Sequence, residues 1–138
     1  MVPLNVLVID DDRSAFELIM GHVDQLGFQE RIALHYANTV SDAIDLISKL
    51  HPDIVLLDLR MPEADGVEHL KRIKALRPDV PVLIFSMYHP DPKKMKEAGA
   101  DGVLDKEAMQ NTKIFGNSIV KILNTILWNR LNKFSSTL

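Results

Sequence analysis

The chain contains no cysteine, no apolar run of membrane-spanning length and no excess of positive charge. Without cysteine it can form neither a disulfide framework nor a thiol-based site. Its formal net charge of -3 gives no basic footprint for nucleic acid. The first residues also lack the charged segment that begins a secretory signal peptide. We therefore expect a cytoplasmic domain that neither crosses a membrane nor binds nucleic acid itself.

Apolar residues are plentiful enough to bury a full core. Hydrophobic residues make up 46% of the chain and charged residues 25%. A length of 138 residues suits one domain and leaves little room for a second. We expect residues 1–128 to form this domain and residues 129–138 to form a helical extension or a linker.

Short apolar runs alternate with amphipathic segments. Strands are expected over residues 6–9, 31–36, 54–57, 81–86 and 103–104, and helices over residues 13–26, 40–50, 67–76, 92–98 and 112–133. Residues 63–66 are expected to form a turn. The candidate helix caps are Asp12 or Ser14, Asn38 or Thr39, and Asp91, with Gly27 ending the first helix. This order of elements predicts an α/β fold with a parallel sheet and helices on both faces.

Chemically useful side chains follow four of the five expected strands. Asp10, Asp11 and Asp12 follow the first strand and Asp58 follows the third. Ser86 ends the fourth strand, and Lys106 comes shortly after the fifth. The carboxyl ends of parallel strands lie at one edge of a sheet, which is where ligands bind in such folds. The sequence therefore predicts one acidic pocket that also holds a hydroxyl and a lysine.

These groups together are suited to phosphoryl transfer. Crowded carboxylates raise one another's pKa unless a cation compensates. Mg²⁺ takes oxygen ligands and commonly works beside a phosphoryl group. A lysine adds a point charge for phosphate, and a serine adds a hydroxyl donor. In such a site Asp58 would be the nucleophile and would form an aspartyl phosphate.

Several motifs at matching spacing resemble one family. They are residues 8–11, residues 55–62 with Asp65-Gly66, Phe85-Ser86, and residues 99–102 leading to Lys106. Together they resemble the receiver domain of two-component response regulators. The resemblance implies a flavodoxin-like, doubly wound, five-stranded parallel sheet in the order 2-1-3-4-5. Ser86-Met87-Tyr88 is similar to receivers of regulators that carry a helix-turn-helix DNA-binding domain.

The same resemblance implies the roles of the site residues. Asp58 accepts a phosphoryl group from a histidine kinase or a phosphotransfer protein. Asp10, Asp11, Asp58 and the backbone carbonyl of Arg60 hold Mg²⁺. Ser86 is the switch hydroxyl and Lys106 the phosphate-binding lysine. A receiver of this kind phosphorylates and dephosphorylates itself and is not an enzyme with a separate substrate.

The sequence departs from the family pattern in three places. Val103 stands where the family often has an aromatic switch residue, which puts an aromatic rotamer switch in doubt. Glu107 follows the lysine where many members have proline, so no cis peptide is expected. The span from Ser86 to Lys106 is about two residues short and contains Pro90 and Pro92, which predicts a shortened or displaced fourth helix.

Two other functions fit parts of the sequence. A hydrophobic strand followed by Asp10-Asp11-Asp12 also resembles Mg²⁺-dependent phosphatases of the haloacid dehalogenase type. There Asp10 would be the nucleophile and Asp12 the general acid, but such enzymes need further acidic residues after the lysine and usually a cap domain. A phosphorylation-independent binding module would normally have lost one of the key groups, and Asp58 and Lys106 are both present.

The final helix carries two apolar stripes. Phe115, Ile119, Ile122 and Ile126 should pack on the sheet, and Val120, Leu127, Leu131 and Phe134 form a neighbouring stripe. Arg130 and Lys133 fall on the core side, so the helix is expected to run past the domain there. The second stripe predicts a partner surface, either for a homodimer through the fourth helix, fifth strand and fifth helix or for an output domain.

Overall fold

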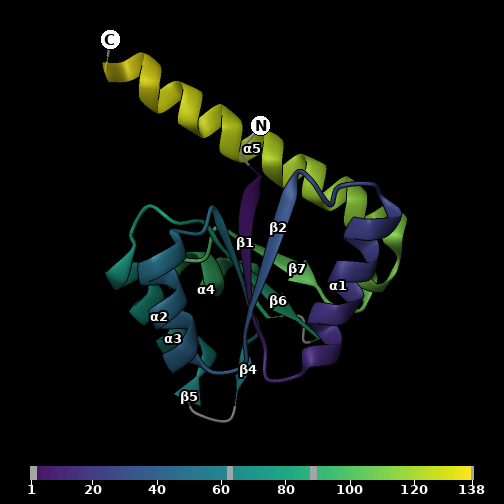
Figure 1. Ribbon diagram of the computed structural model, residues 1–138. Coiled ribbons are helices and arrows are strands. Elements are labelled where there is room, and N and C mark those ends of the chain that lie inside the picture. The colour runs from purple at the N-terminus through teal and green to yellow at the C-terminus, as the bar shows by residue number, and fades with distance from the viewer. Residues whose placement is uncertain (1–2, 62–63, 88–89, 138) are drawn as a thin grey trace.

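A five-stranded parallel sheet lies at the centre of the molecule (Figure 1). The computed structural model describes residues 3–61, 64–87 and 90–137. The strands of the sheet are β1 (Leu4–Ile9), β2 (Ile32–Ala37), β3 (Ile54–Leu57), β6 (Val82–Ser86) and β7 (Gly102–Asp105). Their spatial order is β2-β1-β3-β6-β7, which is the predicted order 2-1-3-4-5. The doubly wound, flavodoxin-like fold is therefore confirmed.

Helices cover both faces of this sheet. Helices α1 (Arg13–Gln25) and α5 (Thr112–Thr137) lie on one face (Figure 1). The other face carries α2 (Val40–Leu50), α3 (Gly66–Leu76) and α4 (Pro92–Glu97). A short 3-10 helix, η1 (Ala108–Gln110), precedes α5 and was not expected from the sequence.

The core has two layers because successive strand residues point to opposite faces. In β1, Leu7 and Ile9 belong to the layer under α2, α3 and α4. Val6 and Val8 belong to the layer under α1 and α5. Strands covered on both faces need apolar residues at every position, which explains the unbroken hydrophobic runs in the sequence.

The helix boundaries follow the capping signals in the sequence. Asp12 caps α1 by accepting hydrogen bonds from the Ser14 amide at 3.0 Å and the Ser14 hydroxyl at 2.7 Å. Thr39 caps α2 by accepting from the Asp42 amide, and Asp91 caps α4 by accepting from the Lys93 amide. Gly27 follows α1 with a φ of 74°, the left-handed conformation predicted for a helix stop.

The expected turn at residues 63–66 is partly wrong. Arg60–Met61 (β4) and Ala64–Asp65 (β5) form a small antiparallel pair, and Gly66 already belongs to α3. A Cβ on Gly66 would lie 2.7 Å from the Leu59 carbonyl oxygen, so the chain passes very close to itself at this point. Two-residue strands have no periodicity, so the sequence pattern could not reveal them.

The final helix is longer than predicted. It ends at Thr137 instead of near residue 133. Phe115 and Ile119 are buried against the sheet and Ile122 packs beside them, as predicted. The side chains of Leu123, Ile126, Leu127 and residues 129–137 lie outside the described part, so the predictions for Ile126, Arg130, Lys133 and most of the second stripe are not tested. Among the described residues, no helix combines the length and apolar character needed to cross a membrane.

Candidate functional site

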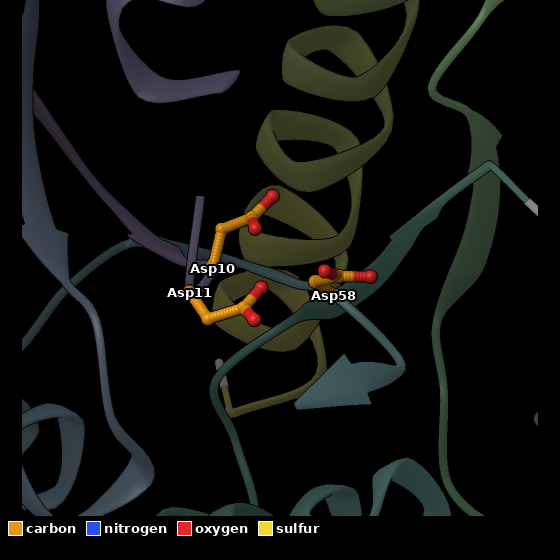
Figure 2. A group of neighbouring side chains, drawn as sticks. All are labelled: Asp10, Asp11 and Asp58. Carbon is orange, nitrogen blue, oxygen red and sulfur yellow. The ribbon is translucent and has the colours of Figure 1, made fainter. Parts of the chain in front are cut away.

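Three carboxylates meet at the carboxyl edge of the sheet. Asp10 and Asp11 follow β1, and Asp58 follows the neighbouring strand β3. Each offers a carboxylate oxygen within 4.8 Å of the others (Figure 2). Asp10 and Asp58 are buried, with 0% and 6% of their surface exposed, whereas Asp11 is exposed. The acidic pocket predicted from the strand ends is therefore present.

Both oxygens of Asp10 are held by hydrogen bonds. The amide of Asp12 donates to Oδ1 at 2.9 Å, and the ammonium of Lys106 donates to Oδ2 at 2.5 Å. The Asp10 amide donates to the Ala37 carbonyl on β2 at 3.1 Å. Asp10 is thus fixed from three directions, as suits a residue that holds other groups in place.

Asp58 is held differently. Its amide donates to the Ile9 carbonyl at 2.9 Å, and its Oδ1 accepts from the Arg60 amide at 3.1 Å. Its Oδ2 lies 3.7 Å from Lys106 Nζ, beyond hydrogen-bond length but within reach of charge attraction. Asp58 therefore presents an oxygen beside a cation that already bonds to Asp10.

Ser86 and Lys106 come from the other side of the pocket. Ser86 ends β6 and is fully buried, and its carbonyl accepts from the Lys106 amide at 2.9 Å. Leu57 pairs with Ile84 in the sheet register, so Ser86 lies one strand away from Asp58 and slightly farther along. The Lys106 ammonium also lies 5.7 Å from the centre of the Phe85 ring. The Lys106 ammonium thus reaches the acidic pocket, and Ser86 lies at the end of the adjacent strand β6.

Burial and charge shift two pKa values in the pocket. Burial raises the pKa of Asp10 above its usual value, although Lys106 and the Asp12 amide oppose the shift. Burial lowers the pKa of Lys106, but its hydrogen bond to Asp10 and the charges of Asp10 and Asp58 outweigh that effect and raise the pKa overall. Lys106 therefore stays charged, and the excess of carboxylates favours a further cation.

The donor set fits a hard divalent ion. Three carboxylates within 4.8 Å supply the oxygen ligands that Mg²⁺ prefers, with room for water on the exposed side of Asp11. When bound, the ion would neutralise charge on phosphoryl oxygens. The Arg60 amide folds back onto Asp58, which keeps that loop next to the carboxylates. The role of the Arg60 carbonyl stays a prediction.

Asp12 lies beside the pocket without joining the acidic cluster. Its carboxylate caps α1, and the hydrogen bonds from Ser14 lower its pKa. Asp12 therefore serves the start of α1, which is the N-cap role expected from the sequence.

Tyr36 also supports the site, and its role was not predicted from the sequence. Its hydroxyl donates to the Asp10 backbone carbonyl at 2.7 Å, and its ring stacks on Phe16 at 5.1 Å. The Arg13 guanidinium lies over both rings. Only the strand order β2-β1, with Tyr36 opposite Val8 in the register, reveals that the hydroxyl reaches Asp10.

The fold and the strand-end cluster define a class of protein: a doubly wound α/β domain with an acidic, lysine-containing pocket at the carboxyl edge of its sheet. The sequence profile of the response regulator receiver domain matches residues 6–114. The chain belongs to this family of two-component signalling domains.

Named relatives agree with this assignment, and a solved structure shares the fold. "Response regulator MprA" from Mycobacterium sp. (strain KMS) is 31% identical over 107 residues, which cover 76% of this chain and 45% of that protein. "Transcriptional regulatory protein ZraR" from Escherichia coli (strain K12) is 39% identical over 85 residues, covering 62% and 18%. The chain thus spans less than half the length of these relatives. The signal receiver domain of a LuxO repressor from Vibrio parahaemolyticus shares the fold with a TM-score of 0.78 at 24% identity, covering 94% of this chain and 96% of that one.

Two of the three departures from the family pattern have a visible structural result. Helix α4 has six residues, which confirms the predicted shortening. The described residues contain no cis peptide, as expected with Glu107 after Lys106. Val103 is half-buried in β7 and packs against the core layer under α2, α3 and α4. Tyr88, part of the motif after β6, lies outside the described residues.

Proposed function

We propose that Asp58 is the phosphoacceptor of this receiver domain and that a histidine kinase or a phosphotransfer protein is the donor. The observation that carries the proposal is the group of three carboxylates at the sheet edge, two of which lie beside Lys106. In the transfer, an Asp58 carboxylate oxygen forms a bond to phosphorus while the bond from phosphorus to the donor histidine breaks. The product is an aspartyl phosphate, which water later hydrolyses.

The surrounding residues support this reaction. Asp10, Asp11, Asp58 and the Arg60 carbonyl would hold Mg²⁺. Lys106 would leave Asp10 and pair with a phosphoryl oxygen, and the Ser86 hydroxyl would donate to another. The chain would then transfer phosphate only to and from its own aspartate and would not act as an enzyme on other substrates. Because kinase donors draw on ATP, this function belongs in the cytoplasm.

The phosphorylation signal would reach a partner at the surface formed by α4, β7 and α5. A groove of about 440 Å³ lies between β7 and α5 and is lined by Leu83, Val103, Leu104 and Ile122, among others. We propose that phosphorylation alters this surface for a homodimer or an output domain, through a two-state change at Ser86 and Lys106. Residues 1–128 would form the receiver and residues 129–138 its helical extension, with no nucleic-acid contact of its own.

The direct test is mass spectrometry after incubation with Mg²⁺ and a small acyl phosphate. We expect one added phosphoryl group on the wild-type chain and none on Asp58→Asn or after chelation of the metal. Asp53→Asn is the matched control, because Asp53 lies at the opposite end of β3, where it accepts from the Asn5 amide at 2.8 Å. A label on Asp10 would favour the phosphatase-like alternative, and no label at all would favour a binding module.

A further inference from the structure

Helix α5 is much longer than the sheet that it covers. Its 26 residues, Thr112–Thr137, span about 39 Å. The longest strands have six residues and span about 20 Å. Figure 1 shows the consequence: the last turns of α5 extend away from the other elements and end far from the sheet.

The inner face of α5 accounts for one apolar stripe. Phe115 and Ile119 are 2% and 5% exposed, and Ile122 packs beside them on the layer under α1 and α5. At about 100° per residue, a second stripe lies roughly 130° around the helix from the first. It begins with Val120, which is 45% exposed.

The second stripe has a strict heptad spacing. Counting from Val120, alternating steps of four and three residues reach the positions Val120, Asn124, Leu127, Leu131 and Phe134. This is the alternation of d and a positions in a coiled coil, with Asn124 and Leu131 at a and the others at d. On the described part of this stripe, Val120 and Asn124 are exposed, and Trp128 beside it is 64% exposed.

We propose that this stripe pairs with the same stripe of a second copy, as a parallel two-stranded coiled coil that extends the receiver domain. Asn124 is the reason to expect a second copy of the chain as the partner of this stripe. In a parallel two-fold pair each a residue meets its own equivalent, and an amide can donate to and accept from an identical amide. A single asparagine at an a position is a known device for fixing register and a two-stranded state.

The flanking positions agree with this partner. In a parallel pair, Leu123 at a g position faces Trp128 of the other copy at an e position, which extends the apolar contact. Arg130, at another g position, faces Ser135 of the other copy, so no like charge opposes it. The paired segment starts beyond Gly116, which is buried against Leu26 of its own domain. The folded domain already fixes the start of α5, which removes the nucleation cost that makes short isolated helices marginal.

The coiled-coil interface lies along α5 alone and does not depend on phosphorylation, whereas the homodimer expected from the sequence would use this stripe together with α4 and β7. Analytical ultracentrifugation of the 138-residue chain tests it. At high micromolar concentration we expect a species of twice the chain mass of 15.6 kDa. Leu127→Asp with Leu131→Asp should give the monomer, while the matched control Asn129→Asp with Asn132→Asp, off the stripe on the same turns, should stay dimeric.

Two further variants test the register. Asn124→Leu should still associate but lose the unique two-stranded state and form larger species. Because the chain has no cysteine, any disulfide formed by Asn124→Cys must join the introduced cysteines of two copies. Under mild oxidation it should cross-link to a covalent dimer, and Asn132→Cys should not. A wild-type monomer with no cross-link at Asn124→Cys would overturn the proposal, as would a dimer that both Asp pairs leave intact.

Discussion

The two edges of the sheet both carry aspartates, and they use them differently. At the amino edge, Asp53 accepts from the Asn5 amide at 2.8 Å. Asp101 accepts from the Val82 amide at 2.8 Å and from Lys74 at 2.7 Å. These carboxylates precede strands that are not neighbours in the sheet, and each connects segments that are distant in sequence. At the carboxyl edge, Asp10 and Asp58 share one lysine, and Asp11 lies beside them.

The difference separates structural from functional carboxylates. An aspartate whose charge is matched by hydrogen-bond donors that serve it alone lowers the free energy of the folded state. A crowd of carboxylates around one cation leaves negative charge uncompensated and raises the free energy of the folded state until a ligand arrives. Replacing a carboxylate at the amino edge should therefore cost stability and spare phosphorylation. Replacing a carboxylate of the cluster at the carboxyl edge should impair phosphorylation and cost less stability.

The largest expected effect comes from Lys106→Ala. The variant should still bind Mg²⁺ but should lose the structural response to phosphorylation, because Lys106 supplies the positive contact to a phosphoryl oxygen. Hydrogen exchange over β6, β7 and α4, with and without phosphodonor, measures the response. Lys74→Ala removes a lysine that pairs with an aspartate at the amino edge and should keep the response. A full response in Lys106→Ala would contradict the assigned role.

Gly66→Ala should show that backbone shape at the carboxyl edge matters as much as charge. An added Cβ would lie 2.6 to 2.7 Å from Leu59, whose backbone cannot easily move without shifting Asp58 and Arg60. We expect a loss of about 2–4 kcal/mol in the free energy of unfolding, measured by urea titration, and slower phosphorylation. Gly21→Ala in α1 is the matched control, because a Cβ there meets nothing within 4 Å. That variant should be stabilised by about 0.4–1 kcal/mol.

Contacts that depend on strand order could not be predicted from the sequence. The hydrophobic runs, the caps and the strand-end residues predicted the sheet and brought Asp10, Asp11, Asp58 and Lys106 to one edge. The bond from Tyr36 to Asp10 was not predictable, since it requires knowing that β2 lies beside β1 and in which register. The ribbon of β4 and β5 was missed because two-residue strands carry no pattern.

Asp101→Ala at the amino edge should lower stability by an intermediate amount. The Val82 amide and Lys74 would both lose their shared acceptor, at a cost of about 1–2 kcal/mol. Phosphorylation of Asp58 should proceed at the wild-type rate, because Asp101 lies at the opposite end of β6 from Ser86. Thermal unfolding and mass spectrometry on the same sample check both halves. Asp45→Ala, an exposed aspartate in α2, should change stability by less than about 0.5 kcal/mol.

Asp11→Asn should cause the smallest change in the free energy of unfolding without metal. Whether this free energy rises or falls distinguishes the two edges. Asp11 is exposed, so its substitution leaves the buried hydrogen bonds of Asp10 and Asp58 in place. Removing one negative charge from the cluster should slightly raise the free energy of unfolding without metal. The wild-type chain should gain stability when Mg²⁺ is added, by mass action on the folded state, and the variant should gain much less. Melting curves with and without Mg²⁺ measure both effects. A metal-free variant less stable than wild type would mean that Asp11 acts as a structural carboxylate, like those at the amino edge.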